Sequence, residues 1–223
     1  VQGENMLAII VAMKKEADAL LCSAAVKNEC TLYGKPVIRG SAFGKDFTLL
    51  LSGVGKSNAA AAAMLAATLP ETDAFLNFGL AGGVPPSAAI GSILRITRAV
   101  QYDFDLSEIN GTPIGTLDEY AEPSFYLQDG ASAFPKALLA TGDRMTNSSD
   151  SLPLLKQLGA ALRDMEGAAI AHVAEFTGLP LWMYKAVSDE IGSGSIEQYT
   201  LYQRQALQAL AQNMHTIFGE IDG

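Results

Sequence analysis

The order in which apolar runs, glycine-rich segments and helical stretches follow one another constrains the fold of this chain most. The glycine-rich segment 53–55 precedes an alanine-rich helical stretch over 56–69, and the apolar run 74–78 leads into a second glycine-rich segment at 79–83. An earlier apolar run, 7–13, is followed by helical spacing of its apolar residues. Strands that alternate with helices are typical of α/β folds. We therefore predict an α/β protein with both glycine-rich segments in loops at strand ends.

Further elements follow from the periodicity of the remaining chain. The runs 36–43 and 46–52 flank Gly44-Lys45, which suits a two-residue type II′ turn, so we predict an antiparallel hairpin. Alternation of residue types predicts a strand over 92–102, and short apolar runs predict strands over 137–141 and 181–187. Helical spacing predicts helices over 14–21 and 196–217, and Gly178 with Pro180 marks the end of a helix over 168–177. Residues 103–130 show no clear period, so we expect a loop that has a function or lies in an interface.

Composition limits the classes of protein that are possible. With 223 residues, 49% of them hydrophobic, the chain is long enough for one compact domain with a sizeable core. Its formal net charge of −9 repels polyanions, which argues against nucleic acid or an anionic membrane surface as a partner. The few cysteines and histidines do not suffice for a disulfide framework or a typical zinc site, so we expect no metal and a reducing, cytoplasmic location.

The chain is expected to form one domain over residues 6–223. No linker, repeat or low-complexity segment divides it. Residues 1–5 lack the basic and apolar regions of a signal peptide, and Met6 is a candidate natural start, so we treat 1–5 as an N-terminal extension. No apolar run approaches the roughly 20 residues that a membrane-spanning helix needs.

The two glycine-rich segments leave two interpretations open. The sequence SGVGKS over 52–57 is no Walker phosphate loop, because that pattern needs a glycine where Leu50 stands, and no dinucleotide fingerprint, because Asn58 occupies the third glycine position. Each segment is either a tight turn or a place where bare backbone approaches a ligand. Ligands of open α/β sheets bind at the carboxyl ends of strands, so we expect both segments to line one crevice.

Three acidic residues follow predicted strands. Glu16 comes after the first strand, Glu166 lies where a helix begins, and Asp189 follows Ser188 at the end of a buried strand. A carboxylate in the first turn of a helix is also favoured by the helix dipole, so an ordinary helix-start role remains an alternative for Glu166. Carboxylates at neighbouring strand ends predict an acidic site.

Seven short motifs occur in one order along the chain: AMKKEADAL, SGVGKSNAA, GLAGG, YDFD, ATGD, RDMEGAAIAHVA and KAVSDE. In this order they resemble the purine nucleoside phosphorylase and nucleosidase superfamily, and most closely the 5′-methylthioadenosine/S-adenosylhomocysteine nucleosidases, over nearly the whole chain. The resemblance implies a three-layer α/β/α sandwich around a mixed, partly barrel-like sheet, and a homodimer. It also implies hydrolysis of the N-ribosidic bond of a purine nucleoside, above all a 5′-thio-substituted adenosine such as methylthioadenosine or S-adenosylhomocysteine.

The resemblance also implies roles for individual residues. Glu16 matches the acid that positions and activates water, Glu166 the acid that binds ribose hydroxyls, and Asp189 the acid that protonates purine N7. Cleavage puts positive charge on the sugar and negative charge on the base, so an acceptor at the sugar and an acid at the base lower the barrier together. Further positions that match substrate-binding residues are Met165, Ala81, Gly82, Met145, Thr146, Ser188, Leu106 and Ile109.

Leu106 and Ile109 match apolar side chains that the family dimer lends to the neighbour's 5′ pocket. Packing within a dimer interface would call for the same residue types, so that simpler role stays open for both.

Three positions depart from the nucleosidase pattern. Leu80 stands where the family usually has serine, Lys185 where it has arginine, and Met145 where it has an aromatic ring that stacks on the base. Lysine lacks the planar fork of arginine, and methionine lacks a flat face. We therefore expect broader base tolerance, or a preferred nucleoside other than methylthioadenosine.

Two other functions stay open at this stage. A phosphorylase needs cations for phosphate, for which Lys14, Lys15 and Lys56 are available, whereas the phosphorylases of this superfamily use arginines. A non-catalytic nucleoside-binding protein needs no general acid, so the presence of all three acids favours an enzyme. No organic cofactor is implied, and the expected partners are a small nucleoside and a second copy of the chain.

Overall fold

The computed structural model describes residues 6–86, 88–145, 149–192 and 196–221. The strands are β1 (Met6–Val11), β2 (Ala25–Leu32), β3 (Lys35–Ala42), β4 (Lys45–Leu51), β5 (Thr72–Gly83), β6 (Ile93–Gln101), β7 (Ser124–Tyr126), β8 (Lys136–Thr141), β9 (Leu162–Asp164) and β10 (Leu181–Glu190). The helices are α1 (Lys14–Leu21), α2 (Lys56–Ala67), α3 (Ser107–Asn110), α4 (Leu152–Gln157), α5 (Gly167–Thr177) and α6 (Ile196–Gly219), with a 3-10 turn at Ser149–Ser151 before α4.

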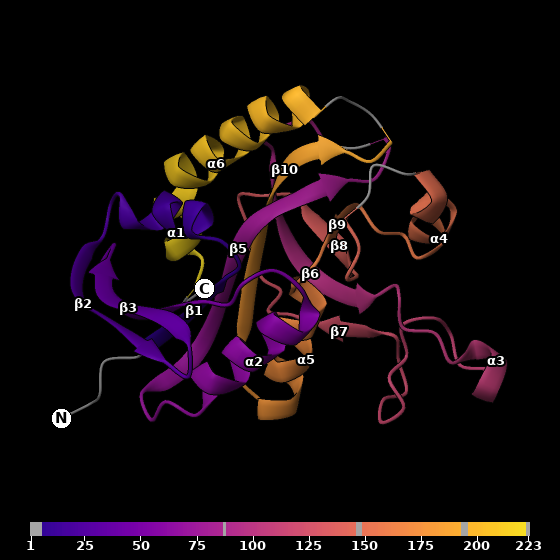
Figure 1. Cartoon of the computed structure of the whole chain (residues 1–223), viewed down its shortest axis with the longest axis horizontal. Coiled ribbons are helices and arrows are strands. Elements are labelled where there is room, and N and C mark those ends of the chain that lie inside the picture. Colours follow the sequence, from indigo (N-terminus) through magenta and orange to yellow (C-terminus); the bar gives the residue numbers. More distant parts are fainter. Residues whose placement is uncertain (1–5, 87, 146–148, 193–195, 222–223) are drawn as a thin grey trace.

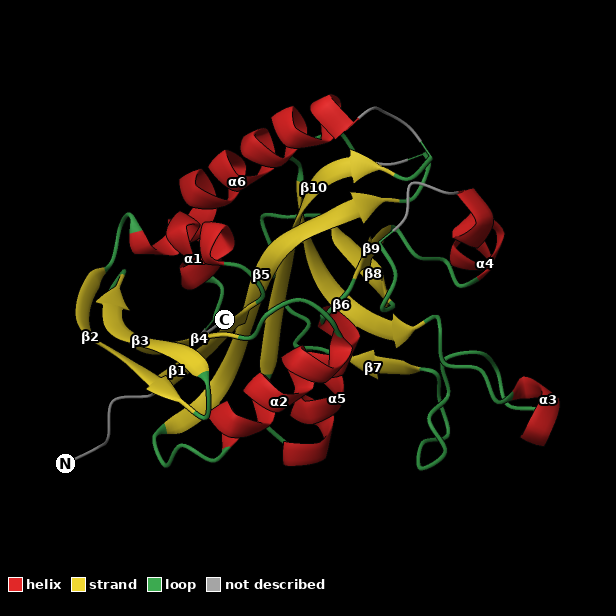
Figure 2. Cartoon of the chain, in the orientation of Figure 1, coloured by secondary structure: helices red, strands yellow, loops and turns green. Residues whose placement is uncertain are grey.

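These strands form one mixed sheet (Figures 1 and 2). Strands β5, β10, β6, β8 and β9 pair in a closed ring, because β5 is hydrogen-bonded to both β9 and β10. From β5 the sheet continues through the parallel strands β1 and β4 to the antiparallel strands β3 and β2. The sheet is therefore barrel-like at one end and open at the other, as the resemblance implies.

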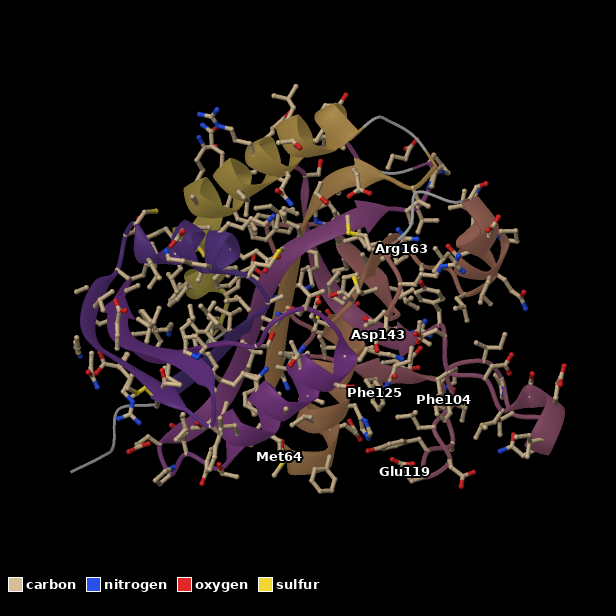
Figure 3. The ribbon with its side chains drawn as sticks, in the orientation of Figure 1. Met64, Phe104, Glu119, Phe125, Asp143 and Arg163 are labelled. Atoms are coloured by element: carbon tan, nitrogen blue, oxygen red, sulfur yellow. The ribbon has the colours of Figure 1, made fainter. Side chains whose placement is uncertain are left out.

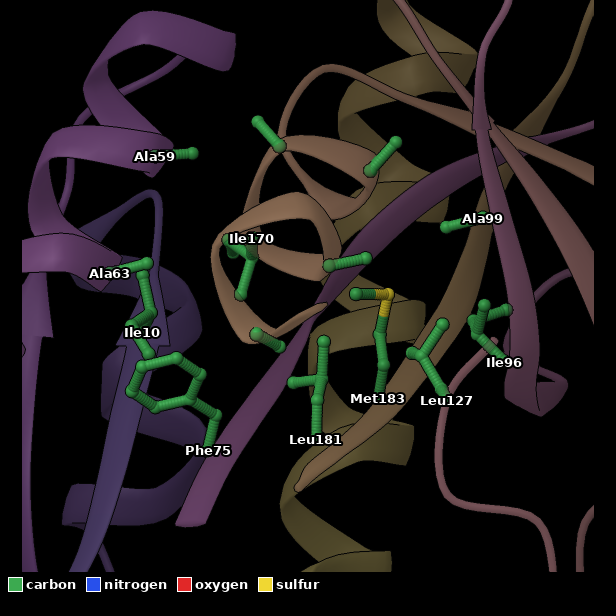
Figure 4. Close-up of a cluster of buried hydrophobic side chains, with 14 of the residues drawn as sticks. Ile10, Ala59, Ala63, Phe75, Ile96, Ala99, Leu127, Ile170, Leu181 and Met183 are labelled. Atoms are coloured by element: carbon green, nitrogen blue, oxygen red, sulfur yellow. The ribbon is translucent and has the colours of Figure 1, made fainter. Parts of the chain in front are cut away.

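Helices cover both faces of the sheet. In Figure 1, α1 and α6 lie on one face and α2 and α5 on the other. Successive residues of β1 alternate between the two layers: Ile10 packs with α2 and α5 in the cluster shown in Figure 4, and Ile9 packs toward α1 and α6. Alanines of α2, such as Ala59 and Ala63, face that cluster. The predicted three-layer α/β/α architecture is confirmed.

The strongly periodic segments fold as predicted. Helix α1 spans the predicted residues, and α2, α5 and α6 differ from the prediction by no more than the last or first turn. Helix α5 ends where Gly178, with φ of 72°, takes the left-handed conformation that glycine adopts without strain. In the segment 103–130, which showed no period, only α3 and β7 are regular.

Three details differ from the sequence predictions. Strands β3 and β4 are antiparallel as expected, but their two-residue turn is Phe43-Gly44 rather than Gly44-Lys45. Both turn residues have positive φ, 51° and 81°, which suits a type I′ turn instead of type II′. Residues 79–83 are not a loop but the end of β5, because β9 and β10 pair with them from either side.

The sequence prediction also missed β2 and α4. Strand β2 is exposed along nearly its whole length, so no alternation of apolar and polar residues marks it. Helix α4 has only six residues. Within the residues that the structure describes, no helix is long and apolar enough to cross a membrane.

Candidate active site

A pocket lies at the carboxyl ends of β1, β5, β9 and β10, the position at which α/β sheets bind ligands. Both glycine-rich segments reach it, one through Val54 and the other through Leu80. The acids that follow predicted strands, Glu16, Glu166 and Asp189, line the same pocket. The topology thus brings together three carboxyl groups from distant parts of the chain.

Glu16 lies in the first turn of α1, and backbone N–H groups hold both of its carboxylate oxygens. Oε2 accepts from Met13 N at 3.0 Å, and Oε1 accepts from Leu80 N at 2.9 Å. The residue is only 3% exposed, and burial raises the pKa of its carboxyl group, although Lys185 and the two N–H groups oppose this shift. Glu16 is therefore fixed in position and binds a proton more readily than an exposed glutamate.

Gly79 explains how β5 approaches this carboxyl group. A Cβ atom at position 79 would lie 2.6 Å from Glu16 Oε1, so any other residue would displace this carboxylate from its present position. The close approach of a carboxylate thus accounts for bare backbone at Gly79, which lies within β5 and not in a tight turn.

Glu166 stands at the N-cap position of α5, and its side chain is joined to the first glycine-rich segment. Its Oε1 accepts from Gly55 N at 2.8 Å, and Gly55 has φ of 101°. Burial raises the pKa of Glu166 to about 7; the negative charge of Asp164 adds to the shift, and Lys185 opposes it. Glu166 therefore changes charge near neutral pH.

Asp164 and Lys185 form a buried ion pair beside these acids. Their charged atoms are 2.9 Å apart, and their side chains are 1% and 3% exposed. Asp164 also accepts from Thr141 Oγ1 at 2.6 Å and from a backbone N–H at 2.9 Å. Burial lowers the pKa of Lys185, but the charges of Asp164, Glu166 and Glu16 outweigh it and raise that pKa overall, so the lysine stays protonated. One buried cation thus offsets several carboxyl groups.

Asp189 lies at the end of β10, half-buried and opposite Gly82 of β5. The Ser188 hydroxyl donates to Asp189 Oδ1 at 2.6 Å. A Cβ atom at Gly82 would lie 3.1 Å from Asp189 Oδ2, so glycine leaves room for this oxygen above the strand. Asp189 is therefore oriented through one oxygen, and the other lies over the end of β5.

The family model described as "Phosphorylase superfamily" matches residues 6–221. The chain belongs to the phosphorylase superfamily. Its sequence is 27% identical to that of the 5′-methylthioadenosine/S-adenosylhomocysteine nucleosidase of Anoxybacillus flavithermus, over 97% of this chain and 99% of that protein. It is 29% identical to the protein of the same name from Shewanella sp. strain MR-7, over 88% of the chain and 89% of that protein.

Solved structures share the fold of this phosphorylase-superfamily chain. A 5′-methylthioadenosine/S-adenosylhomocysteine nucleosidase from Colwellia psychrerythraea, in complex with adenine, superposes with a TM-score of 0.88 at 24% identity, covering 97% of this chain and 95% of that one. Futalosine hydrolase of Helicobacter pylori superposes with a TM-score of 0.86 at 21% identity, covering 97% and 98%. At these identities the similarity establishes the fold alone.

The pocket is lined by most of the residues that the sequence analysis assigned to the site: Glu16, Ala81, Gly82, Met145, Met165, Glu166, Ser188 and Asp189. Thr146 lies outside the described residues. Leu106 precedes α3, and Ile109, within α3, is 81% exposed; neither lines the pocket of its own chain.

The three departures from the nucleosidase pattern have different surroundings. Leu80 contributes its backbone N–H to Glu16, a contact that does not depend on the side chain. Lys185 is committed to the buried pair with Asp164. Met145 is 61% exposed at the edge of the pocket.

Sequence reasoning did not identify several other residues that line the pocket: Met13, Arg144, Arg163 and Asp164. A possible signal was present in the motif RDMEGAA, where Asp164 stands two residues before Glu166 and the basic Arg163 stands in a short strand. Within the described ranges, no group of three or more His, Cys, Asp or Glu side chains could hold a metal ion.

Proposed function

We propose that the protein hydrolyses the N-ribosidic bond of a purine nucleoside and releases the base. The observation that supports this most is the convergence of Glu16, Glu166 and Asp189 on one pocket. Similarity along nearly the whole chain to proteins named 5′-methylthioadenosine/S-adenosylhomocysteine nucleosidase supports the same reaction. Methylthioadenosine and S-adenosylhomocysteine are therefore the first substrates to test.

In the proposed step, a water molecule attacks the C1′ atom of the ribose. The water oxygen forms a bond to C1′, the C1′–N9 bond breaks, and its electron pair goes to the base. Glu16 takes a proton from the water, and Asp189 gives a proton to N7, so the base leaves neutral. Positioned acids and bases of this kind contribute about 10²–10⁴-fold each to rate.

Glu16 suits the role of general base for water. Two backbone N–H groups fix its carboxylate, and each oxygen has a second lone pair with which to hold a water molecule. Burial raises its pKa, and a base whose pKa lies closer to the working pH takes a proton more readily.

Glu166 suits the recognition of ribose. Gly55 N occupies Oε1, and we assign Oε2 to the ribose hydroxyls. Asp189 suits proton donation to the base, because Ser188 fixes Oδ1 and Gly82 leaves space around Oδ2. The ribose is thereby assigned to Glu166 and the base to Asp189.

Phosphorolysis is the alternative that the sequence left open, and the contacts of two of its three candidate lysines favour water. Lys14 pairs with Asp18 on the exposed side of α1, and Lys56 pairs with Asp103 at 2.6 Å. A phosphate ion at the position assigned to water would lie against the Glu16 carboxyl group, whose charge repels it.

We further propose that residues 6–223 form a single domain and that two copies form a homodimer. Ile109 is 81% exposed on α3, and a second chain would cover it and could bring it to the neighbouring 5′ pocket. The exposed Cys22 and Cys30 are free thiols, which suits a reducing, cytoplasmic location.

One experiment tests the proposed reaction. The protein is incubated with methylthioadenosine, S-adenosylhomocysteine, adenosine and inosine, with and without phosphate, and the products are separated by chromatography. We expect free base and the free sugar, which is ribose or its 5-thio-substituted form, from at least one nucleoside in the absence of phosphate. Ribose 1-phosphate formed only with phosphate would assign a phosphorylase, and binding without any product would assign a non-catalytic protein.

A further inference from the structure

Asp143 binds the start of α2 from a distant part of the chain. The residue before this helix is Gly55, which has no side chain that could accept from the N–H groups of the first turn. Asp143 follows β8, and its Oδ1 accepts from the backbone N–H of Lys56, the first residue of α2, at 2.7 Å. Figure 3 shows Asp143 beside this end of α2. A carboxylate in this position also suits the positive end of the helix dipole.

Three residues close a ring of hydrogen bonds at this point. Lys56 donates through its ammonium group to Asp103 Oδ1 at 2.6 Å, and Asp103 Oδ2 accepts from the backbone N–H of Asp143 at 2.9 Å. The third contact is that of Asp143 with the Lys56 N–H. The ring joins the motifs SGVGKSNAA, YDFD and ATGD, and it ties the start of α2 to the ends of β6 and β8. Because each residue takes part in two of the three contacts, the ring fixes the Asp143 carboxylate in place.

The same carboxylate lies against the residue that holds Glu166. Gly55 directs its N–H to Glu166 Oε1 at 2.8 Å, and the next N–H along the chain is the one that Asp143 binds. The Cβ position of Gly55 would lie 3.2 Å from Asp143 Oδ1, so this oxygen covers the open side of the glycine. Two consecutive N–H groups are thus held by two carboxylates. Only the φ and ψ angles of Gly55 separate them, so fixing one N–H restrains the other.

Glycine supplies little restraint of its own to these angles. Gly55 has φ of 101° and ψ of 155°, and glycine loses more conformational freedom on folding than any other residue. The contact at Lys56 therefore supplies a restraint that Gly55 lacks. We propose that Asp143 is a positioning residue for Glu166: it holds the first glycine-rich segment so that the N–H of Gly55 stays on Glu166 Oε1 and leaves Oε2 for the ribose. This inference rests on the proposed function, which assigns Glu166 to the ribose.

A role confined to the stability of α2 predicts a different result. Loss of Asp143 would then lower the free energy of unfolding and leave the contact between Gly55 and Glu166 unchanged. The amide proton of Gly55 reports this contact, because its chemical shift changes when the carboxylate that it binds takes up a proton. Burial raises the pKa of Glu166 to about 7, so the change falls near neutral pH. The charges of Asp164 and Lys185 also act on this pKa, and both residues are kept in every variant.

The experiment follows the amide signal of Gly55 by NMR between pH 5 and pH 9. The signal is identified by its loss in Gly55→Ala, and its shift near pH 7 is assigned to Glu166 by comparison with Glu166→Gln. The test variants are Asp143→Ala and Asp143→Asn. Asp73→Ala is the matched control, because Asp73 is also exposed and accepts a backbone N–H from a distant segment, that of Met6 at 2.9 Å, at the opposite end of β5 from the pocket. Urea unfolding checks that each variant folds.

We expect the Gly55 signal to shift near pH 7 in the native protein and in Asp73→Ala, and most of this shift to be lost in Asp143→Ala. Asp143→Asn keeps an oxygen that accepts from the Lys56 N–H, so it should retain the shift in large part. If Asp143→Ala does not fold, Lys56→Met, which opens the ring at Asp103, takes its place and should show a partial loss. An unchanged shift in the alanine variant or in its replacement would overturn the proposal, and so would a native signal without a shift near pH 7.

Steady-state kinetics tests the consequence for the reaction, with whichever of methylthioadenosine, S-adenosylhomocysteine, adenosine and inosine is cleaved. Asp143→Ala should lower kcat/KM by about tenfold or more, the effect of losing one hydrogen bond to a charged group. In a Glu166→Gln background the same substitution should add little, because both residues act through one contact. An additive loss in that background would overturn a role through Glu166. If no nucleoside is cleaved, the hydrolase proposal falls, and the NMR titration still decides whether Asp143 positions Glu166.

Discussion

The backbone N–H of Gly55 donates to Glu166 Oε1 at 2.8 Å, which joins two parts of the chain that are 111 residues apart in sequence. Gly55 has φ of 101°, and a Cβ atom there would lie 3.2 Å from Asp143 Oδ1. A side chain at position 55 would therefore strain the backbone at this N–H and press on Asp143, which disturbs the contact with Glu166. The contact shows why a glycine-rich segment with no nucleotide-binding motif belongs to the site.

Gly55→Ala should weaken nucleoside binding and lower kcat/KM by about tenfold or more, the effect of losing one hydrogen bond to a charged group. Gly34→Ala is the matched control, because Gly34 also has positive φ, 79°, but has open space around it in the turn between β2 and β3. Both variants should lose some stability from backbone strain, and only Gly55→Ala should lose activity. Equal activity of the two variants would remove Gly55 from the site.

Asp189→Asn should remove most turnover and leave the fold intact. The amide keeps the shape of the side chain but cannot give a proton to the base, so we expect a loss of about 10²-fold or more in kcat. The measurement is steady-state hydrolysis, with circular dichroism to check folding and Asp150→Asn as a control outside the pocket. A variant that retains more than about a tenth of native turnover would show that Asp189 is not the general acid.

Glu16→Gln and Glu166→Gln should change different kinetic quantities. Water activation acts only in the transition state, so Glu16→Gln should lower kcat with substrate affinity largely kept. Ribose hydrogen bonds act in the ground state as well, so Glu166→Gln should weaken affinity and lower the rate together. Calorimetric binding of a nucleoside alongside kinetics measures both quantities. Unchanged affinity in both variants would contradict this division of roles.

Stability should depend on pH through Glu166. Burial raises its pKa from 4.5 to about 7 on folding, so between these values the folded protein binds more protons than the unfolded chain. The stabilisation from this group is therefore full below about pH 4.5 and is lost as the pH rises through 7, by at most about 1.4 kcal/mol per pH unit. Urea unfolding at pH 5, 6, 7 and 8 measures it.

Glu166→Gln should flatten this dependence because the amide does not titrate. Glu29→Gln, on the exposed strand β2, is the control and should leave the native slope unchanged. The same slope in native protein and Glu166→Gln would mean that another group, such as Glu16, whose pKa is also raised by burial, dominates the titration.

Local patterns predicted the parts of the fold in which burial and periodicity agree. Strand β1 is a continuous apolar run because helices cover both its faces, and α2 is evident from its alanines. The extended backbone at residues 79–83 could not be predicted, because pairing with β9 and β10 overrides the preference of glycine for turns. Strand β2 has no apolar face, so only its pairing with β3 defines it.

The site likewise has residues that could be predicted from the sequence and contacts that could not. Glu16, Glu166 and Asp189 could be found because each follows a strand or starts a helix, and topology places such positions at one edge of the sheet. The burial and the charged neighbours of these acids could not be predicted, because they depend on contacts between residues far apart in the sequence. The cation that offsets their charge, Lys185, is paired with Asp164 through the packing of β10 near β9. Sequence alone suggested only that lysine was a weaker substitute for arginine.

Lys185→Met should be strongly destabilising. It removes the buried positive charge that offsets the carboxyl groups of Asp164, Glu16 and Glu166. Loss of one partner from a buried ion pair costs about 3–5 kcal/mol in free energy of unfolding. Lys185→Arg keeps the charge and should recover part of that loss. Lys136→Met is the control, because Lys136 pairs with Asp129 at the surface, with both side chains largely exposed, and it should change stability far less.

Urea unfolding at pH 5 and pH 8 would show whether Lys185 acts through these acids. At the lower pH a larger fraction of Glu166 is protonated, so less negative charge is left uncompensated when the lysine is removed. The difference in stability between native protein and Lys185→Met should therefore be smaller at pH 5 than at pH 8. A loss that is equal at both pH values would show that Lys185 acts through its pair with Asp164 or through packing and not through the charge of Glu166, and the charge balance inferred for the site would be wrong.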